Sequence, residues 1–322
     1  MSSSKNLRWT VDAMVTRKCN FRCAHCMYSC SNKESPELDP TMLYTLAQTL
    51  KEHTPSLAIF GGEPTLAQAF AENVGGLAHY YAECFGSLFV ATNGSWMLPG
   101  NYKMAEAMDS YCRLGKRIGE FSFSISDDQY HRPFWKNPEY FLRPSGVEEW
   151  ASDILCPEDH DTDEPSLPYL REAVAKEQYG FREWNYHGFK SGTKVSPRGR
   201  AKRLCVDFQG SCCLYNLLTE ETEDREYEVE LRPDGNLYYG CCLGCKAVVG
   251  RYDSTEEQIL EGIKQWETFL RERLQKQSIL PRQYTGVRLC DEGKACASCD
   301  TVARRYNKQA TCPAVTATTS NT

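Results

Sequence analysis

The sequence predicts an α/β fold with a parallel sheet, followed by a smaller cysteine-rich region. Short β-rich runs alternate with longer helical stretches at a spacing of roughly 30 residues, which is typical of right-handed βαβ units. Polar or special residues stand directly after each predicted strand, at the edge of the sheet where α/β proteins carry their active sites. Of the 17 cysteines, four lie within residues 19–30 and ten lie after residue 200.

The predicted elements follow one another without a tandem repeat. Asp39 and Pro40 form a favourable start for a helix, and Gly75-Gly76 should weaken or interrupt the helix that contains them. Alternating apolar residues and β-branched or aromatic runs mark the strands. The predicted strands are 9–16, 56–60, 87–91, 120–126 and 181–186, and the predicted helices are 39–53, 65–84, 104–116 and 164–177.

A second region is predicted beyond a segment rich in glycine, serine and basic residues, 188–201. It contains a β-hairpin, with strands 227–231 and 236–239 around a Pro-Asp-Gly turn, and then a long polar helix over 256–276. The predicted domains are therefore 1–200 and 201–307, with a disordered tail over 308–322.

Composition restricts the class of protein. The 322 residues are 41% hydrophobic and 25% charged, as in ordinary globular proteins, and the net charge of −6 argues against binding a large nucleic acid through bulk positive charge. No run approaches the ~18 apolar residues of a membrane span, and the opening MSSSKNLRWT has no apolar signal-peptide core. We therefore expect a cytoplasmic protein, with reduced cysteines that bind metal.

The first cysteine group has the spacing C-x3-C-x2-C, formed by Cys19, Cys23 and Cys26. Three thiolates can hold a 4Fe–4S cluster and leave one iron with an open position. The alternative is a structural zinc site, with Cys30 or His25 as the fourth ligand.

Three later strand ends extend this pattern. Gly61-Gly62-Glu63-Pro64 follows the second strand, Thr92-Asn93-Gly94 follows the third, and Ser124-Ile125-Ser126-Asp127 ends the fourth. With the cysteine loop, these motifs make residues 8–190 resemble the radical S-adenosylmethionine (SAM) superfamily. The resemblance implies a partial (β/α)6 TIM-like barrel as the first domain.

The same resemblance implies roles for individual residues. The open iron of the cluster would chelate the amino and carboxylate groups of SAM, and reductive cleavage of SAM would give a 5′-deoxyadenosyl radical that abstracts a substrate hydrogen. Gly61 and Gly62 would let the backbone approach the methionine moiety, while Glu63 would accept a charge-assisted bond from its ammonium group. The residues expected near the ribose, carboxylate and adenine are Asn93, Ser124, Ser126 and His25.

The ten later cysteines resemble the SPASM or shorter twitch extensions of peptide-modifying radical SAM enzymes, which hold an auxiliary 4Fe–4S cluster. By this resemblance the ligands are Cys205, Cys241, Cys296 and Cys299, with Cys213, Cys245 and Cys290 as alternates. A zinc site is the structural alternative, and ten cysteines suffice for a second auxiliary cluster. The isolated Cys84, Cys112 and Cys156 are expected to be small, buried apolar residues.

Adjacent cysteines rarely reach the same compact metal site, so one of Cys241 and Cys242 is expected to be a free thiol. The order of motifs most resembles the radical SAM peptide epimerases, which act on ribosomally made peptides. This implies that Cys242 donates a hydrogen atom, and that Asp127, Asp128 and His131 lie near a precursor peptide. It also implies an electron donor such as flavodoxin or ferredoxin. The alternatives are thioether or C–C crosslinking of a peptide, modification of a nucleotide or small metabolite, and a non-enzymatic zinc module.

Overall fold

The computed structural model describes residues 7–23, 26, 28–97, 100–126, 131, 185–188, 226–240, 247–276 and 306–307. Several sequence predictions lie outside these residues. They concern the helix over 164–177, the domain boundary near residue 200, the tail after 307, and the residues His25, Asp127, Asp128, Cys156 and every cysteine after residue 200.

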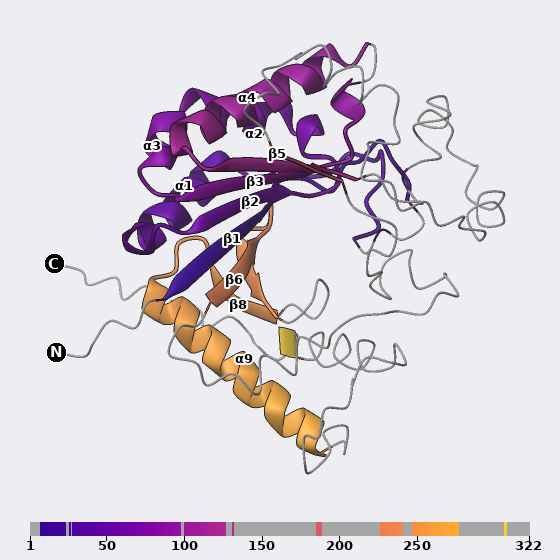
Figure 1. The fold of residues 1–322 in the computed structure, drawn as a ribbon. Coiled ribbons are helices and arrows are strands. Elements are labelled where there is room, and N and C mark those ends of the chain that lie inside the picture. Colours follow the sequence, from indigo (N-terminus) through magenta and orange to yellow (C-terminus); the bar gives the residue numbers. More distant parts are fainter. Residues whose placement is uncertain are drawn as a thin grey trace, which may run out of the picture.

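One eight-stranded sheet forms the centre of the described structure, in the order β5-β4-β3-β2-β1-β6-β7-β8 (Figure 1). Neighbouring strands from β5 to β6 in this order are parallel, whereas β7 is antiparallel to both β6 and β8. The strands are β1 (Arg8–Met14), β2 (Ser56–Phe60), β3 (Ser87–Thr92), β4 (Phe121–Ile125), β5 (Asn185–Gly188), β6 (Glu226–Leu231), β7 (Asn236–Tyr239) and β8 (Ala247–Arg251). The predicted α/β class with a parallel sheet is confirmed.

Helices follow the strands as the sequence predicts. The described helices are α1 (Pro40–Leu50), α2 (Gln68–Gly76), α3 (Ala78–Ala82), α4 (Tyr102–Ile118) and α9 (Glu256–Lys276), with short 3-10 turns at Lys51–His53, Pro64–Leu66 and Ser95–Met97. The Asp39 side chain accepts a bond from the Thr41 amide and so caps α1. The predicted helix over 65–84 is divided into α2 and α3 directly after Gly75-Gly76.

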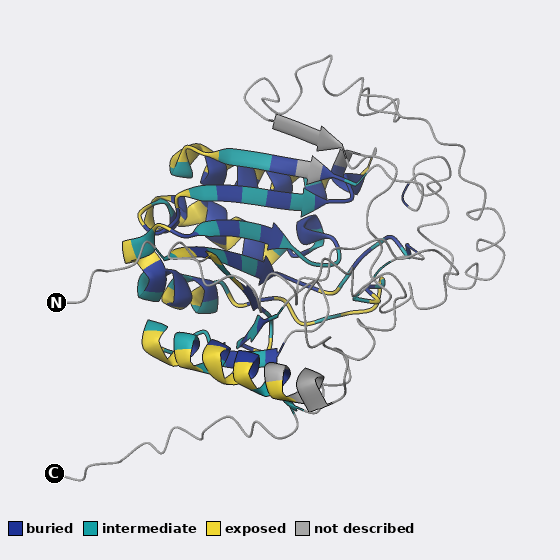
Figure 2. Ribbon diagram, turned by 60° about the horizontal axis from the view of Figure 1, so that its bottom comes forward, coloured by how far each residue is buried: buried dark blue, intermediate teal, exposed yellow. Residues whose placement is uncertain are grey.

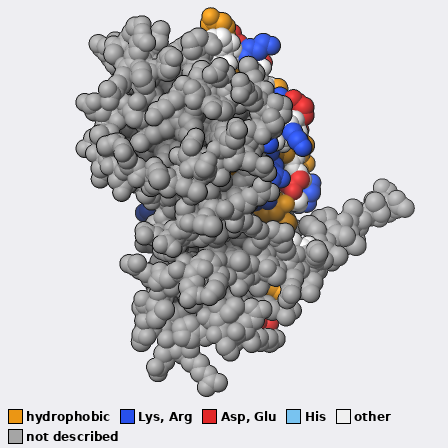
Figure 3. Space-filling view, turned by 90° about the vertical axis from the view of Figure 1, so that its right-hand side faces the viewer, with side chains coloured by type: hydrophobic (Ala, Val, Ile, Leu, Met, Phe, Trp, Pro, Cys, Tyr) orange, Lys and Arg blue, Asp and Glu red, His pale blue; other side chains and the backbone are white. Residues whose placement is uncertain are grey.

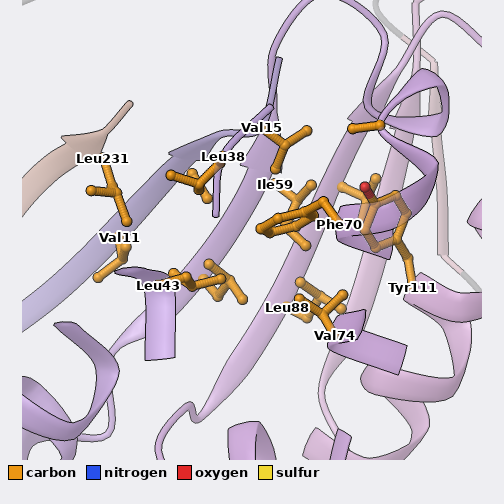
Figure 4. Close-up of a cluster of buried hydrophobic side chains, with 14 of the residues drawn as sticks. Val11, Val15, Leu38, Leu43, Ile59, Phe70, Val74, Leu88, Tyr111 and Leu231 are labelled. Atoms are coloured by element: carbon orange, nitrogen blue, oxygen red, sulfur yellow. The ribbon is translucent and has the colours of Figure 1, made fainter. Parts of the chain in front are cut away.

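The main core lies between the sheet and the helices that cover one of its faces. Along β1, β2 and β3 every second residue is buried, including Val11, Ile59 and Leu88. These side chains meet Leu43 of α1, Phe70 and Val74 of α2 and Tyr111 of α4 (Figure 4). α9 lies along the other end of the sheet, with its buried positions toward the strands and its exposed positions outward (Figure 2).

The predicted C-terminal hairpin and the helix over 256–276 are confirmed, but their attachment to the barrel was not predicted. β6 pairs in parallel with β1, more than 200 residues away, and places Glu230 beside Asp12. At the start of β1, the Glu256 carboxylate accepts a bond from Trp9 Nε1 at 3.2 Å and lies 2.9 Å from His53 Nε2. The hairpin and α9 are therefore fixed directly to the N-terminal strands.

On the face seen in Figure 3, the visible described side chains form a band in which Lys and Arg, Asp and Glu, and hydrophobic groups are mixed. Among the described residues, no helix is both long enough and apolar enough to cross a membrane.

Candidate active site

The first cysteine loop leaves β1 at the carboxyl edge of the sheet and is pinned at both ends. Val15 N donates to Phe60 O at 2.9 Å, which continues the pairing of β1 with β2 beyond the strand. The returning segment is held by Cys19 N, which donates to Ser31 O at 2.7 Å, and by Leu38 N, which donates to Val15 O at 2.8 Å. The fully buried Phe21 ring anchors the loop between these ends. The sheet edge therefore fixes where the thiols stand.

The thiols of this loop are close enough to affect one another electrostatically. Cys19, Cys23 and Cys30 are buried, and Cys26 is half-buried. Burial raises the pKa of Cys19 well above its ordinary value, and the charges of Cys23 and Glu63 raise it further. Without a cation, such a group keeps its proton; iron would replace the proton and compensate both burial and repulsion.

Glu63 is completely buried among hydrogen-bond donors from two loops. Its Oε1 accepts from Thr65 N at 3.2 Å, Thr65 Oγ1 at 2.6 Å and Thr92 Oγ1 at 2.8 Å, while its Oε2 accepts from Asn93 N at 2.7 Å. Burial raises the pKa of Glu63, and these donors act in the opposite direction. A carboxylate oxygen has two acceptor sites, so Oε2 retains capacity for one further cationic donor. Sequence reasoning found Glu63 but missed the two threonines that orient it.

The two glycines before Glu63 are required by backbone packing. A Cβ at Gly61 would lie 2.4 Å from Thr16 O, and one at Gly62 would lie 2.2 Å from Lys18 O. This close approach lets Gly62 N donate to Thr16 O at 2.7 Å and Glu63 N donate to Lys18 O at 2.9 Å. The GGE segment is thereby paired with the start of the cysteine loop, and this explains both glycines without reference to a ligand.

Asn93 connects the loop after β3 to the cysteine loop. Its Nδ2 donates to Asn20 Oδ1 at 3.0 Å and to Cys19 Sγ at 3.8 Å, and its Oδ1 accepts from Ser95 N at 2.9 Å. Asn20 Nδ2 in turn donates to Ser95 Oγ at 2.8 Å. Three of the predicted motifs, the cysteine loop, GGEP and TNG, therefore meet at one edge of the sheet.

The remaining described candidates lie at or near this edge. Ser124 is in β4, opposite Ala91 of β3, and Ser126 N donates to Thr92 O at 2.9 Å just beyond the strand. The His131 ring is buried, with its centroid 6.0 Å from that of Phe21. The structure thus brings His131 against the cysteine loop, although the substrate role expected of it stays a prediction.

A polar cluster that sequence reasoning missed joins this loop to the C-terminal hairpin. The buried Glu230 of β6 accepts from Tyr28 Oη at 3.0 Å and from Arg232 Nε. The Arg232 guanidinium also lies over the Tyr238 ring, 3.7 Å from its centroid. Glu230 and Tyr28 are 202 positions apart, so no local sequence pattern could have indicated the contact.

The donor set fits an iron–sulfur cluster held by three cysteines. Cys19, Cys23 and Cys26 come from one pinned loop, and the Sγ atoms of Cys19 and Cys26 both accept N–H bonds, from Phe21 N at 3.4 Å and Cys30 N at 3.3 Å. Within the described ranges, no group of three or more His, Cys, Asp or Glu side chains is placed to hold a single metal ion. A 4Fe–4S cluster does not require that convergence, because each thiolate binds a different iron.

The fold and this edge together define an α/β enzyme domain with an iron–sulfur site at the carboxyl ends of parallel strands. Residues 14–143 match the family model described as the radical SAM superfamily. This part of the chain belongs to that superfamily, and membership implies a 4Fe–4S cluster and SAM as cofactors.

A relative among characterised proteins is the GTP 3′,8-cyclase of Haemophilus influenzae (strain PittEE), which is 28% identical over 148 residues. The match covers 44% of this chain and 37% of the relative, so the chain spans well under half of that protein's length.

Three solved structures show distant similarity. BtrN in complex with AdoMet and 2-DOIA has a TM-score of 0.44 at 16% identity, over 88% of this chain and 91% of that one. An anSMEcpe structure with bound AdoMet has a TM-score of 0.38 at 13% identity, over 94% and 98%. SuiB of Streptococcus suis bound to S-adenosylmethionine has a TM-score of 0.32 at 10% identity, over 81% and 68%. Similarities this remote do not indicate a substrate.

Proposed function

We propose that this protein is a radical SAM enzyme that epimerises a residue of a ribosomally made peptide from L to D. The observation that carries the radical SAM part is the meeting of the cysteine loop, the buried Glu63 and Asn93 at one sheet edge. The peptide part rests on the SPASM-like or twitch-like arrangement of the later cysteines in the sequence.

Cys19, Cys23 and Cys26 would hold the cluster, and the free acceptor site of Glu63 Oε2 would receive the SAM ammonium. When bound, the reduced cluster supplies the electron that cleaves SAM to a 5′-deoxyadenosyl radical, which removes the Cα hydrogen of the substrate residue. The buried surroundings of Cys19 and Glu63 exclude water from this chemistry.

In this proposal Cys242 returns a hydrogen atom to the opposite face of the Cα radical. Its S–H bond breaks, a C–H bond forms, and the thiyl radical left on Cys242 takes up one electron and one proton to become a thiol again. An external one-electron donor of the flavodoxin or ferredoxin class would supply that electron and the electron that reduces the SAM cluster. An auxiliary cluster held by Cys205, Cys241, Cys296 and Cys299 belongs to the same proposal.

The test is incubation with SAM, reductant and the precursor peptide encoded beside the gene, in deuterated solvent. Epimerisation predicts a D-residue and a gain of one deuterium at its Cα, and Cys242→Ala should give no D-product while it still forms 5′-deoxyadenosine. A product that lacks two hydrogens would replace epimerisation with crosslinking. An unmodified peptide in the presence of 5′-deoxyadenosine formation would refute the peptide assignment and leave the radical SAM assignment intact.

A nucleotide substrate is the second candidate, because the relative identified above is a GTP cyclase. Incubation of the same enzyme with GTP, SAM and reductant tests it. Conversion of GTP with stoichiometric formation of 5′-deoxyadenosine supports this candidate, and unchanged GTP eliminates it.

A further inference from the structure

Cys30 is the fourth cysteine of the first loop and has no place in the C-x3-C-x2-C motif. It is only 2% exposed. Its backbone N donates to Cys26 Sγ at 3.3 Å, and its side chain is also hydrogen-bonded to that of Cys26. An iron-bound thiolate can only accept hydrogen bonds, so in the loaded protein the Cys30 thiol would be the donor.

The backbone around Cys30 is shaped to make these two contacts. Ser29 has a φ of +55°, a left-handed conformation that costs a non-glycine residue about 1–2 kcal/mol. Ser29 N donates to Cys26 O at 3.3 Å, which folds the chain back over Cys26. The segment is fixed on each side of Cys30, because Arg17 donates to Tyr28 O and Cys19 N donates to Ser31 O at 2.7 Å. A strained residue held by neighbours on both sides indicates a required geometry.

Donors to a ligand sulfur affect the electron affinity of an iron–sulfur cluster. The reduced cluster carries one more negative charge than the oxidised one, so N–H and S–H groups directed at the sulfur stabilise the reduced form more and raise the reduction potential. Cys19 receives a comparable pair of donors, from Phe21 N and Asn93 Nδ2. Two ligand sulfurs of the loop are thus held in donor-rich surroundings.

We propose that Cys30 is a positioning residue, whose thiol and backbone N–H both donate to Cys26 Sγ and so raise the reduction potential of the cluster held by this loop. The inference rests on the proposed SAM cluster, and it assigns Cys30 a role other than that of an iron ligand. Cys30 keeps its thiol proton in every step of this assignment.

The experiment is a redox titration of the anaerobically reconstituted full-length enzyme, followed by the electron paramagnetic resonance signal that changes on SAM binding. Cys30→Ala removes the S–H donor, and Cys30→Ser keeps a hydroxyl donor at the same place. A net hydrogen bond of about 0.5–1.5 kcal/mol corresponds to a roughly threefold to tenfold weaker reduction equilibrium for the alanine variant. At 59 mV per tenfold for one electron, this is a shift of about 30–60 mV to more negative potential.

The serine variant should recover most of the lost potential, which a purely structural role would not require. Cys84→Ala, at another buried cysteine, is the matched control and should leave the potential unchanged. An unshifted potential in Cys30→Ala would overturn the inference, as would loss of iron from that variant, since iron loss would make Cys30 a ligand. Absence of any SAM-responsive signal in the wild type would instead refute the proposed SAM cluster.

Discussion

Replacing Gly62 by alanine tests whether the GGE segment owes its glycines to contact with the cysteine loop. The added Cβ would lie 2.2 Å from Lys18 O and 2.7 Å from Lys18 C, both backbone atoms that cannot rotate away. The two segments would have to separate by about 1 Å, which counts as overpacking of a close contact. Separation weakens the bonds from Gly62 N to Thr16 O and from Glu63 N to Lys18 O.

The size of the effect follows from these contacts. Each of the two hydrogen bonds contributes about 1 kcal/mol net, and forced overpacking costs about 1–3 kcal/mol. Gly62→Ala should therefore lower the free energy of unfolding by about 3–5 kcal/mol. Because the same bonds hold Glu63 beside Cys19, the variant should also bind iron less well in the first loop.

Urea denaturation of the full chain under anaerobic, reducing conditions, followed by circular dichroism, measures this loss. The control is Gly76→Ala at the exposed end of α2, where nothing lies within 4 Å of the added Cβ. That change should be neutral or stabilising by up to about 1 kcal/mol, since alanine is the better helix former. Equal stability of the two variants would refute the close-contact explanation of Gly62.

Two further substitutions have opposite diagnostic value. Burial raises the pKa of Glu63, so the folded protein holds that proton more tightly than the unfolded chain, and the Glu63 contribution to unfolding free energy declines as pH rises from the ordinary carboxyl pKa through the raised one; the wild-type value minus that of Glu63→Gln, from urea melts at several pH values, should decline over that window, and a rising difference contradicts the assignment. Glu256→Ala removes the contacts to Trp9 and His53 and should cost about 1–2 kcal/mol in a thermal or urea melt, whereas Glu257→Ala, in the same helical turn but exposed, should cost less; equal losses would mean that those contacts contribute nothing.

The local signals in the sequence were sufficient for most of the described fold. Period-two burial predicted β2 and β3 to within a residue, and the Asp39-Pro40 start and Gly75-Gly76 interruption appear where expected. These features depend on neighbours in the chain. The pairing of β6 with β1 depends on contacts more than 200 residues apart, and for that reason β8 and the position of the hairpin were not foreseen.

The candidate site shows the same division. Glu63 and Asn93 were predicted because motifs at consecutive strand ends must meet at one edge of a parallel sheet. The residues that orient them, Thr65, Thr92 and Asn20, are ordinary polar residues, and only the coordinates identify them as partners. The roles of Gly61 and Gly62 toward SAM stay predictions, beside the packing reason that the structure supplies.

The central claim is that Cys19, Cys23 and Cys26 hold a cluster that binds SAM. The most direct measurement is the electron paramagnetic resonance spectrum of the reduced protein with and without SAM, for the wild type and for a variant with all three cysteines changed to alanine. The account predicts that SAM alters the wild-type signal and that the variant has no SAM-responsive signal. A SAM-responsive signal that persists in the triple variant would contradict it.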